Sequence, residues 1–312
     1  MVAAEDESSR CPGCESSEFS PTGLRVDAAG TPADLIRCRR CRTERWQRAH
    51  TEEDADVSVY WELYKADVDL DPDVRMAFER RYAAVFERLE RVAEPLRILD
   101  IGGGIGNFAA WAERDLGAAT VTADVDETAI ARARARGLTA MLAGDVPASI
   151  EPASMNVVSL WDVIEHVADP TPLLTQAAAA LAPGGRLVLE TPDARFPLRP
   201  VLLTLHRISG GRLDLTGPLY YWEHKTYYTE KGMRELLARH GFRITWCERW
   251  TSPSAKLTRT LDEVGREGTR SSRVVNRGLS RAYPMIDRII SRVGAGNKLM
   301  IIATRDGDAA ET

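Results

Sequence analysis

The sequence predicts an α/β fold built on a doubly wound, largely parallel sheet, and three observations support this prediction. From Leu96 onward, short apolar runs alternate with helical patterns, which is the order that βαβ units require. Some runs, such as Leu187–Leu189, are continuously apolar, which is typical of strands buried on both faces. A glycine-rich turn follows the first run, and glycines there let backbone N–H groups approach a ligand closely.

The pattern places each element of this sheet in order. Apolar runs rich in β-branched residues predict strands over 96–102, 119–124, 139–144, 156–163, 185–192, 242–250 and 297–305. Apolar residues at helical spacing predict helices over 74–94, 107–115, 127–136, 171–182 and 229–241. The alternation pauses over 193–228 and again over 251–293, and both stretches are interpreted as lid-like insertions.

Composition excludes several classes of protein. The chain has 312 residues, of which 44% are apolar and 28% are charged, and this is too apolar for a disordered protein. No apolar run approaches the roughly 18–20 residues of a transmembrane helix, and residues 1–10 lack the apolar segment of a signal peptide. We therefore expect a cytoplasmic protein. Its net charge of −5 disfavours general nucleic-acid binding, although a local basic patch could still act.

The cysteines predict a structural zinc site. Four of them form two CxxC pairs, namely Cys11 with Cys14 and Cys38 with Cys41. Two such knuckles can present four thiolates tetrahedrally to Zn²⁺, which leaves no open position for catalysis. Residues 1–50 are accordingly predicted to form a small zinc-ribbon module. The alternative is four unrelated free thiols.

Six arginines crowd around the second knuckle within twelve residues. They are Arg37, Arg39, Arg40, Arg42, Arg45 and Arg48. One interpretation is a phosphate-binding patch for a nucleotide-linked, carrier-linked or RNA substrate. The other is a solvated face whose charge is balanced by the acidic residues of 51–56. Both interpretations stay open at this point.

The glycine-rich turn has the spacing D-x-G-x-G-x-G, formed by Asp100, Gly102, Gly104 and Gly106. A nicotinamide dinucleotide fingerprint would place Gly or Ala three residues after the second glycine, where this chain has Asn107. Asp100 also suits a ligand with a positive amino group better than a pyrophosphate. The turn resembles motif I of the class I S-adenosylmethionine-dependent methyltransferases.

Later landmarks extend this resemblance. Asp124 ends the second strand about twenty residues after the glycines, where an acid can bind both ribose hydroxyls. Asp145 and Val146 follow the third strand, and a Pro-Gly-Gly turn at 183–185 precedes the fifth. The resemblance implies a seven-stranded sheet with an antiparallel last strand. It also implies that Asp100 and the glycines seat the methionine part of S-adenosyl-L-methionine, Asp124 its ribose, and Asp145 with Val146 its adenine.

The cysteine knuckles, followed by an aromatic segment at 60–64, resemble a subgroup in which a zinc ribbon precedes the methyltransferase core. Sugar C-methyltransferases and many natural-product enzymes belong to this subgroup. The resemblance divides the chain into the ribbon, a helical cap or linker over 51–95, and a core formed by 96–250 and 294–306.

Three aromatic residues are assigned to the cofactor site. Tyr60 and Tyr64 lie at i and i+4, so both can face one side of a short helix. Relatives often cover the cofactor with such aromatics, whereas packing in the core is the alternative for this pair. Trp161, at the end of the fourth strand, lies at the edge where open α/β sheets bind their ligands.

Two histidines are candidates for a general base. Methyl transfer to a hydroxyl, a phenol or an acidic carbon removes a proton, and an imidazole with a pKa of about 6.5 suits this task. His166 follows the fourth strand, and His224 lies in a stretch that resembles the segment preceding the family's helix near 230. A structural role in bridging loops is the alternative for each. The family's signature for gripping a planar amino group is absent after the fourth strand.

These inferences predict an S-adenosylmethionine-dependent methyltransferase that acts on oxygen or carbon of a small-molecule acceptor, either a specialised metabolite or a sugar-like compound. The expected partner is this acceptor rather than nucleic acid. Leucines and basic residues mix over 197–208, which is interpreted as a lid over an apolar acceptor or a segment lying on a membrane surface. Dimer contacts are a further alternative for 251–293, and a solvated helical insertion is the alternative for both segments. The alternative functions are an RNA methyltransferase that uses the arginine-rich ribbon and a non-catalytic cofactor-binding scaffold.

Overall fold

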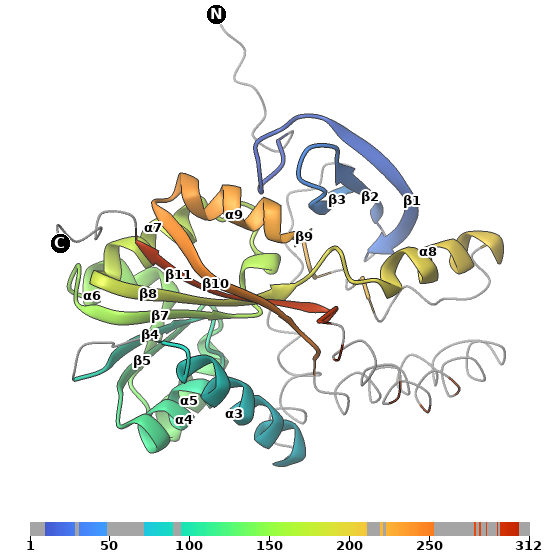
Figure 1. Cartoon of the computed structure of the whole chain (residues 1–312). Helices are drawn as coiled ribbons and strands as arrows, with labels where there is room; N and C mark the ends of the chain where they lie inside the picture. Colours follow the sequence, from blue (N-terminus) through green and yellow to red (C-terminus); the bar gives the residue numbers. More distant parts are fainter. Residues whose placement is uncertain are drawn as a thin grey trace, which may run out of the picture.

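The computed structural model describes most of the chain. It contains a large β-sheet and a smaller one beside it (Figure 1). The described residues are 10–28, 31–48, 72–89, 95–210, 219–220, 223–252 and 294–305, with the single positions 278, 281, 285 and 292. Within them, no helix is both long enough and apolar enough to cross a membrane.

The larger sheet has seven strands in the order β10-β11-β8-β7-β4-β5-β6. Their bounds are β4 Arg97–Ile101, β5 Ala119–Asp124, β6 Ala140–Leu142, β7 Met155–Trp161, β8 Leu181–Pro192, β10 Phe242–Trp250 and β11 Lys298–Arg305. Strands β6, β5, β4, β7 and β8 run parallel, and β11 lies antiparallel between β8 and β10. The doubly wound fold with an antiparallel last strand is therefore confirmed.

Helices cover both faces of this sheet, as Figure 1 shows. They are α3 Pro72–Phe86, α4 Asn107–Leu116, α5 Glu127–Ala135, the short α6 Val146–Ser149, α7 Thr171–Ala180 and α9 Glu230–Arg239. Side chains alternate between the two faces along each strand. Accordingly, Leu187 and Leu189 pack in the cluster that contains α7 and α9, whereas Val188 packs in the cluster that contains α3 and α4.

Several predicted boundaries are wrong. The predicted helix 74–94 is helical only to Phe86 in the described part, because the backbone N–H groups of Arg88 and Leu89 bond three residues back and tighten the turn; residues 90–94 lie outside the described residues. The predicted strand 185–192 begins earlier, at Leu181, because Leu181 pairs with Met155 before a register shift at the Pro-Gly-Gly turn. The preceding helix accordingly ends at Ala180 rather than at 182.

The smaller sheet is the ribbon. Strands β1 Phe19–Ala28, β2 Thr31–Cys38 and β3 Glu44–Arg48 form an antiparallel meander, and the two-residue strand β9, Thr226–Tyr227, adds to its edge. Strand β9 belongs to the predicted lid 193–228, so the edge strand of the ribbon sheet comes from a distant segment of the chain. No pattern in the sequence predicted this pairing.

The ribbon is also packed against helix α9. Thr229 caps the start of α9 and donates its hydroxyl hydrogen to the carbonyl of Cys41, at 2.7 Å. A Cβ at Gly232 would collide with the Thr43 hydroxyl, so glycine is needed for this close approach. At the other end of α9, Arg239 donates to the carbonyls of Pro12 and Gly13. Both cysteine knuckles are thereby held against one helix.

The predicted lid segment 197–208 forms helix α8, Leu198–Ile208. Leu203 is buried in a cluster with ribbon residues such as Leu35. By contrast, Val201, Leu205 and Ile208 are exposed. One side of α8 is therefore fixed to the ribbon, and the other carries apolar side chains toward solvent.

Candidate functional site

The glycine-rich turn connects β4 to α4 and requires its glycines. Gly102, Gly104 and Gly106 have φ angles of 72°, 56° and 77°, in the left-handed region that favours glycine. A Cβ at Gly102 would collide with Val163. Gly103, which the spacing pattern did not single out, is also required, because a Cβ there would overlap the Asp100 carboxylate. Backbone and acid thus approach each other with no side chain between them.

Two buried acids stand beside this turn, at the ends of the neighbouring parallel strands β4 and β5. Asp100 accepts a hydrogen bond from the Ser159 hydroxyl at 2.7 Å. Asp124 accepts from the backbone N–H of Gly104 at 2.8 Å and from that of Asp126 at 3.0 Å. One carboxylate therefore ties the glycine turn to the next strand, and both acids lie where a polar ligand over the turn would meet them.

The other predicted cofactor residues are more dispersed. Asp145 is exposed in the short 3-10 helix after β6, whereas the side chain of Val146 is buried in the core. The Trp161 ring packs on the α3 and α4 side of the sheet, with its centroid 4.8 Å from that of Tyr82. Tyr60 and Tyr64 lie outside the described residues.

This arrangement fits S-adenosylmethionine. A glycine-rich turn lets a ligand approach the backbone closely, and the start of the helix that follows favours a carboxylate. The buried Asp100 is an acceptor for an amino group, and Asp124 is an acceptor for hydroxyl groups. Asp100, Asp124 and the glycines are brought together, as the resemblance implied, and their roles toward the cofactor stay predictions.

The two candidate histidines, far apart in sequence, lie against each other. The ring centroids of His166 and His224 are 4.6 Å apart, at an interplanar angle of 86°. His166 follows β7 in the 3-10 helix Ile164–His166, and its Nδ1 lies 3.2 Å from the carbonyl oxygen of Glu223. Burial lowers the pKa of His224 well below its usual value, and the neighbouring His166 and Lys298 disfavour its charged form further. His224 is therefore neutral at physiological pH.

Three ionisable residues near this pair, Glu165, Asp162 and Lys298, were not identified from the sequence. Glu165 accepts from the Thr191 hydroxyl at 3.0 Å, and one of its carboxylate oxygens lies within 4.8 Å of ring nitrogens of both histidines. Burial, with the negative Asp162 nearby, raises the pKa of Glu165 to about 8. Asp162 is in turn paired with Lys298, the first residue of β11. The adjacency of Glu165 to His166 was the one sequence signal for this group.

The four cysteines form a compact buried cluster. The Sγ atoms of Cys11 and Cys41, and those of Cys14 and Cys38, are 3.5 Å apart, and all four lie within 4.8 Å of one another. Hydrogen bonds from Cys11 and Thr43 lower the pKa of Cys41 to about 5, whereas burial raises the pKa of Cys14 to about 12. Four sulfur donors at this spacing fit a tetrahedral Zn²⁺ with bonds of about 2.3 Å.

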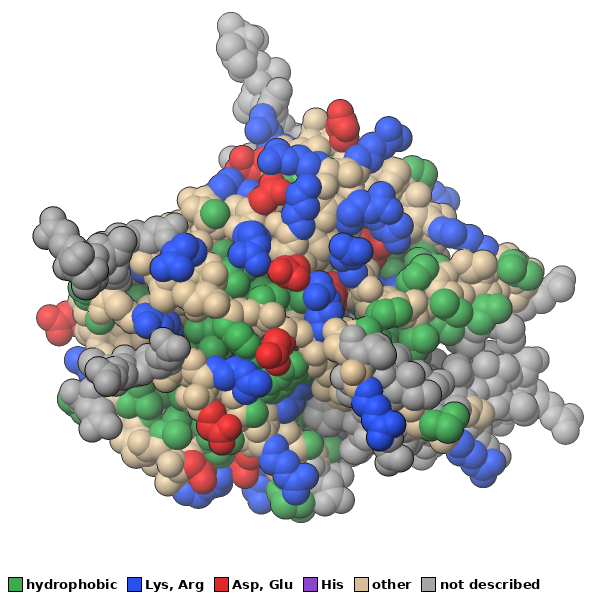
Figure 2. Space-filling view, in the orientation of Figure 1, with side chains coloured by type: hydrophobic (Ala, Val, Ile, Leu, Met, Phe, Trp, Pro, Cys, Tyr) green, Lys and Arg blue, Asp and Glu red, His purple; other side chains and the backbone are tan. Residues whose placement is uncertain are grey.

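The arginines around the second knuckle divide into two groups. Arg37 bonds to Glu44, Arg40 pairs with Glu235, and Arg45 lies over the ring of Phe19. Arg39 and Arg42 are exposed, and the side chain of Arg48 is not among those that the structure describes. Figure 2 shows Lys and Arg gathered over the ribbon end of this face, with acidic side chains among them. Much of this charge is used in contacts within the molecule.

A match to a protein-family model shows which family the chain belongs to. A family model described as a methyltransferase domain matches residues 75–245, more than half of the chain. The chain belongs to this family. The match begins in α3 and ends in β10, so it includes the glycine turn, both buried acids and the histidine pair.

Curated relatives resemble part of the chain. The ubiquinone biosynthesis O-methyltransferase of Chelativorans sp. (strain BNC1) is 37% identical over 128 residues, which cover 38% of this chain and 50% of that protein. Methyltransferase GfsG of Streptomyces halstedii is 29% identical over 140 residues, covering 42% of this chain and 50% of that protein. The chain thus spans about half the length of the curated relatives it matches.

Solved structures share the fold. Phosphoethanolamine N-methyltransferase 2 of Haemonchus contortus superposes with a TM-score of 0.53 at 15% identity, covering 91% of this chain and 71% of that one. The PH0226 protein of Pyrococcus horikoshii OT3 gives a TM-score of 0.51 at 15% identity, covering 79% of this chain and 98% of that one. At these identities the likeness concerns the fold alone.

Proposed function

We propose that the chain is an S-adenosylmethionine-dependent methyltransferase that acts on oxygen or carbon of a small-molecule acceptor. The observation that carries this proposal is the contact of His166 with His224 at the carboxyl ends of the parallel strands. His166 follows β7, which pairs with β4, and β4 leads into the glycine turn. A candidate base therefore follows the strand next to the one that leads into the predicted cofactor site.

The chain's own residues would orient the reaction. S-adenosylmethionine supplies a methyl group already activated on a sulfonium, so the protein must align the acceptor behind it. Such alignment can supply roughly 7–11 kcal/mol of the barrier. Asp100, the glycines and Asp124 would hold the cofactor, with Asp145 and Val146 at its adenine.

The histidines would take up the acceptor's proton. A carbonyl oxygen can only accept, so the contact with Glu223 places the proton of His166 on Nδ1 and the lone pair on Nε2. His224, kept neutral by burial and by neighbouring positive charges, offers a second unprotonated nitrogen. Either ring can then act as a general base at neutral pH.

Zinc would hold the ribbon in place. Cys11, Cys14, Cys38 and Cys41 would provide all four ligands, so the metal would be structural rather than catalytic. The ribbon strand β3 pairs with β9, which begins two residues after His224. The ribbon would thereby support one candidate base.

The test is methyl transfer from labelled S-adenosylmethionine to a cell extract separated into small-molecule, lipid, protein and RNA fractions. We expect label in the small-molecule or lipid fraction. Label in RNA would instead support the RNA methyltransferase and give a role to Arg39 and Arg42. Normal cofactor binding without transfer to any fraction would support a non-catalytic scaffold.

A further inference from the structure

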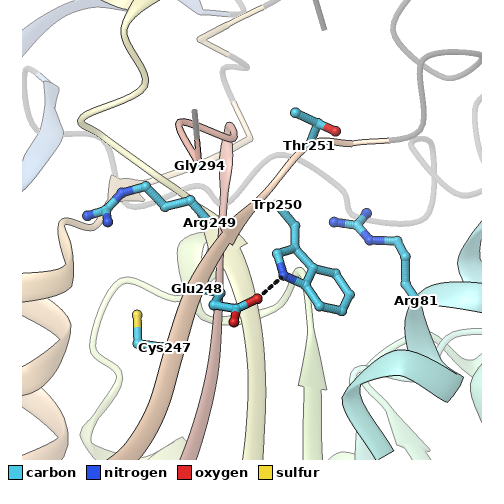
Figure 3. A pocket seen from close by; sticks show the side chains of 7 residues that line it. All are labelled: Arg81, Cys247, Glu248, Arg249, Trp250, Thr251 and Gly294. Carbon is cyan, nitrogen blue, oxygen red and sulfur yellow. Dashed lines mark hydrogen bonds between the residues drawn. The ribbon is translucent and has the colours of Figure 1, made fainter. Parts of the chain in front are cut away.

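A cavity of about 560 Å³ opens beside the end of β10, apart from the glycine turn (Figure 3). Its lining includes Arg81 from α3 and Arg249 and Trp250 from β10. Ligand-binding cavities have volumes of about 300–1,000 Å³, so this one can hold a small aromatic molecule. Neither the family match nor the histidine pair assigns a role to it.

Arg81 is a buried cation with unused donors. Its side chain is 9% exposed, and in the described part of the chain none of its three guanidinium nitrogens makes a hydrogen bond. Its Nη1 lies 3.2 Å from a carboxylate oxygen of Glu190, an ion pair that lacks hydrogen-bond geometry. Buried guanidinium groups normally satisfy most of their five N–H donors. The guanidinium of Arg81 therefore has N–H donors that lack a hydrogen-bond acceptor in the described part of the chain.

The second arginine of the cavity differs in this respect. Arg249 donates to Asp193 at 2.7 Å and to Glu230 at 3.2 Å. Its charge is thus already bound by two carboxylates. Of these two arginines, Arg81 is the one with donors available to an incoming anion.

Trp250 provides a flat apolar wall next to this cation. Figure 3 shows the Arg81 guanidinium directed from α3 toward the indole, and its central carbon lies 6.0 Å from the ring centroid. The indole N–H donates to Glu248 at 3.0 Å, which fixes the orientation of the ring. A guanidinium beside a fixed aromatic face can bind a planar molecule that carries an oxyanion.

We propose that this cavity binds the oxyanion of an aromatic acceptor, with Arg81 binding a carboxylate or a phosphate and Trp250 packing against the ring. The cavity lies at the edge of the sheet where the parallel strands end, which is also the edge that carries the histidines. Glu190, the partner of Arg81, pairs with Trp161 at the end of β7, and Trp250 pairs with Lys298. An acceptor anchored here would extend from β10 toward the histidines beyond β7. The proposal rests on the proposed function only in naming the bound molecule as the acceptor.

The test measures binding of three probes by ligand-observed NMR at neutral pH. They are 4-hydroxybenzoate, phenyl phosphate and the uncharged 4-hydroxybenzyl alcohol. We expect at least one anion to bind about tenfold more tightly than the alcohol, because charge-assisted hydrogen bonds to Arg81 are lost with the uncharged probe. The better anion identifies the oxyanion. In Arg81→Gln this preference should disappear.

Arg88 gives a matched control. It belongs to the turn after α3, and its guanidinium carbon lies 5.8 Å from the centroid of the Trp250 ring. Its side chain is 38% exposed, and it is not among the residues that line the cavity. Arg88→Gln should keep the preference for the anion. Because Arg81→Gln leaves Glu190 buried without its cation, the neutral double variant Arg81→Gln/Glu190→Gln is measured beside it.

Three outcomes would overturn the proposal: no binding of either anion, equal binding of anions and alcohol, or a preference that survives loss of Arg81. S-adenosylhomocysteine binding and methyl transfer are measured on the same samples. If the proposed function is wrong, transfer is absent while the anion preference remains. If this inference is wrong, the preference is absent while transfer remains.

Discussion

Arg199 of α8 and Glu44 of the ribbon form an ion pair inside the molecule, with Nη1 3.7 Å from Oε2 and side-chain exposures of 4% and 1%. The Arg199 guanidinium also lies over two aromatic rings that contact each other, 4.4 Å from the centroid of Tyr220 and 4.2 Å from that of Tyr227. Tyr227 in turn contacts His224, with ring centroids 5.5 Å apart. The ribbon, α8 and a candidate base therefore form one packed unit.

Glu44→Gln should destabilise the protein strongly. The substitution leaves the Arg199 charge buried without its partner, and breaking a buried pair in this way costs about 3–5 kcal/mol. Chemical denaturation would measure the free energy of unfolding. Asp34→Asn is the control, because the Asp34–Arg25 pair is exposed and its loss should leave stability unchanged. Equal stability of the Glu44→Gln variant and wild type would show that the pair contributes nothing.

Zinc removal should destabilise the ribbon and its contacts with α9. We expect about one zinc per chain in purified protein by elemental analysis. Cys41→Ser should lose that zinc and melt at a lower temperature, because Thr229 bonds to the Cys41 carbonyl and Gly232 packs beside its sulfur. Cys247→Ser, which changes a cysteine outside the cluster, is the control. A metal-free protein with wild-type melting would refute the zinc site.

Asp124→Ala should weaken binding of S-adenosylhomocysteine by about 1–3 kcal/mol, the cost of losing a buried hydrogen-bond partner. The carboxylate also holds the Gly104 N–H, so part of the loss would come from a less ordered turn. Calorimetric titration measures the affinity. Asp115→Ala, an exposed change at the far end of α4, should have no effect. Unchanged affinity in Asp124→Ala would rule out the ribose assignment.

Glu165→Gln should change how stability depends on pH. Burial raises the pKa of Glu165 to about 8, so the folded state holds a proton that the unfolded state releases near pH 4.5. The resulting stabilisation is fully present below about pH 4.5 and is lost as the pH rises from there to about 8. The neutral glutamine escapes this loss and can still accept from Thr191.

The prediction for Glu165 is tested by measuring melting temperatures of wild type and variant across a range of pH values. The difference between Glu165→Gln and wild type should grow in favour of the variant from about pH 4.5 to about pH 8, between the two pKa values, and then level off. Glu151→Gln, at an exposed position, should follow wild type throughout. A constant difference across the range would mean that Glu165 is ionised in the folded protein.

Local patterns predicted the sheet because strand–helix alternation and the positions of glycines are properties of short segments. The same holds for the cysteine pairs, whose spacing alone predicts a metal site. By contrast, the pairing of β9 with β3 and the contact of Glu44 with Arg199 join segments more than 150 residues apart. Arg81 illustrates the limit most clearly. In the helical pattern of 74–94 it resembles any surface arginine, and only packing against β10 shows that it is buried.

The histidine pair yields the most direct prediction for catalysis. If one ring is the base, its alanine variant should lose turnover by roughly 10²–10⁴-fold while S-adenosylhomocysteine affinity is unchanged. His224 must be neutral to accept a proton, and burial lowers its pKa well below the usual value. The acid limb of a His224-dependent rate should therefore lie below about pH 6.5, the ordinary histidine value. His206→Ala, on α8, is the control. If both His166→Ala and His224→Ala keep wild-type turnover, no base is required and alignment of the acceptor accounts for the rate.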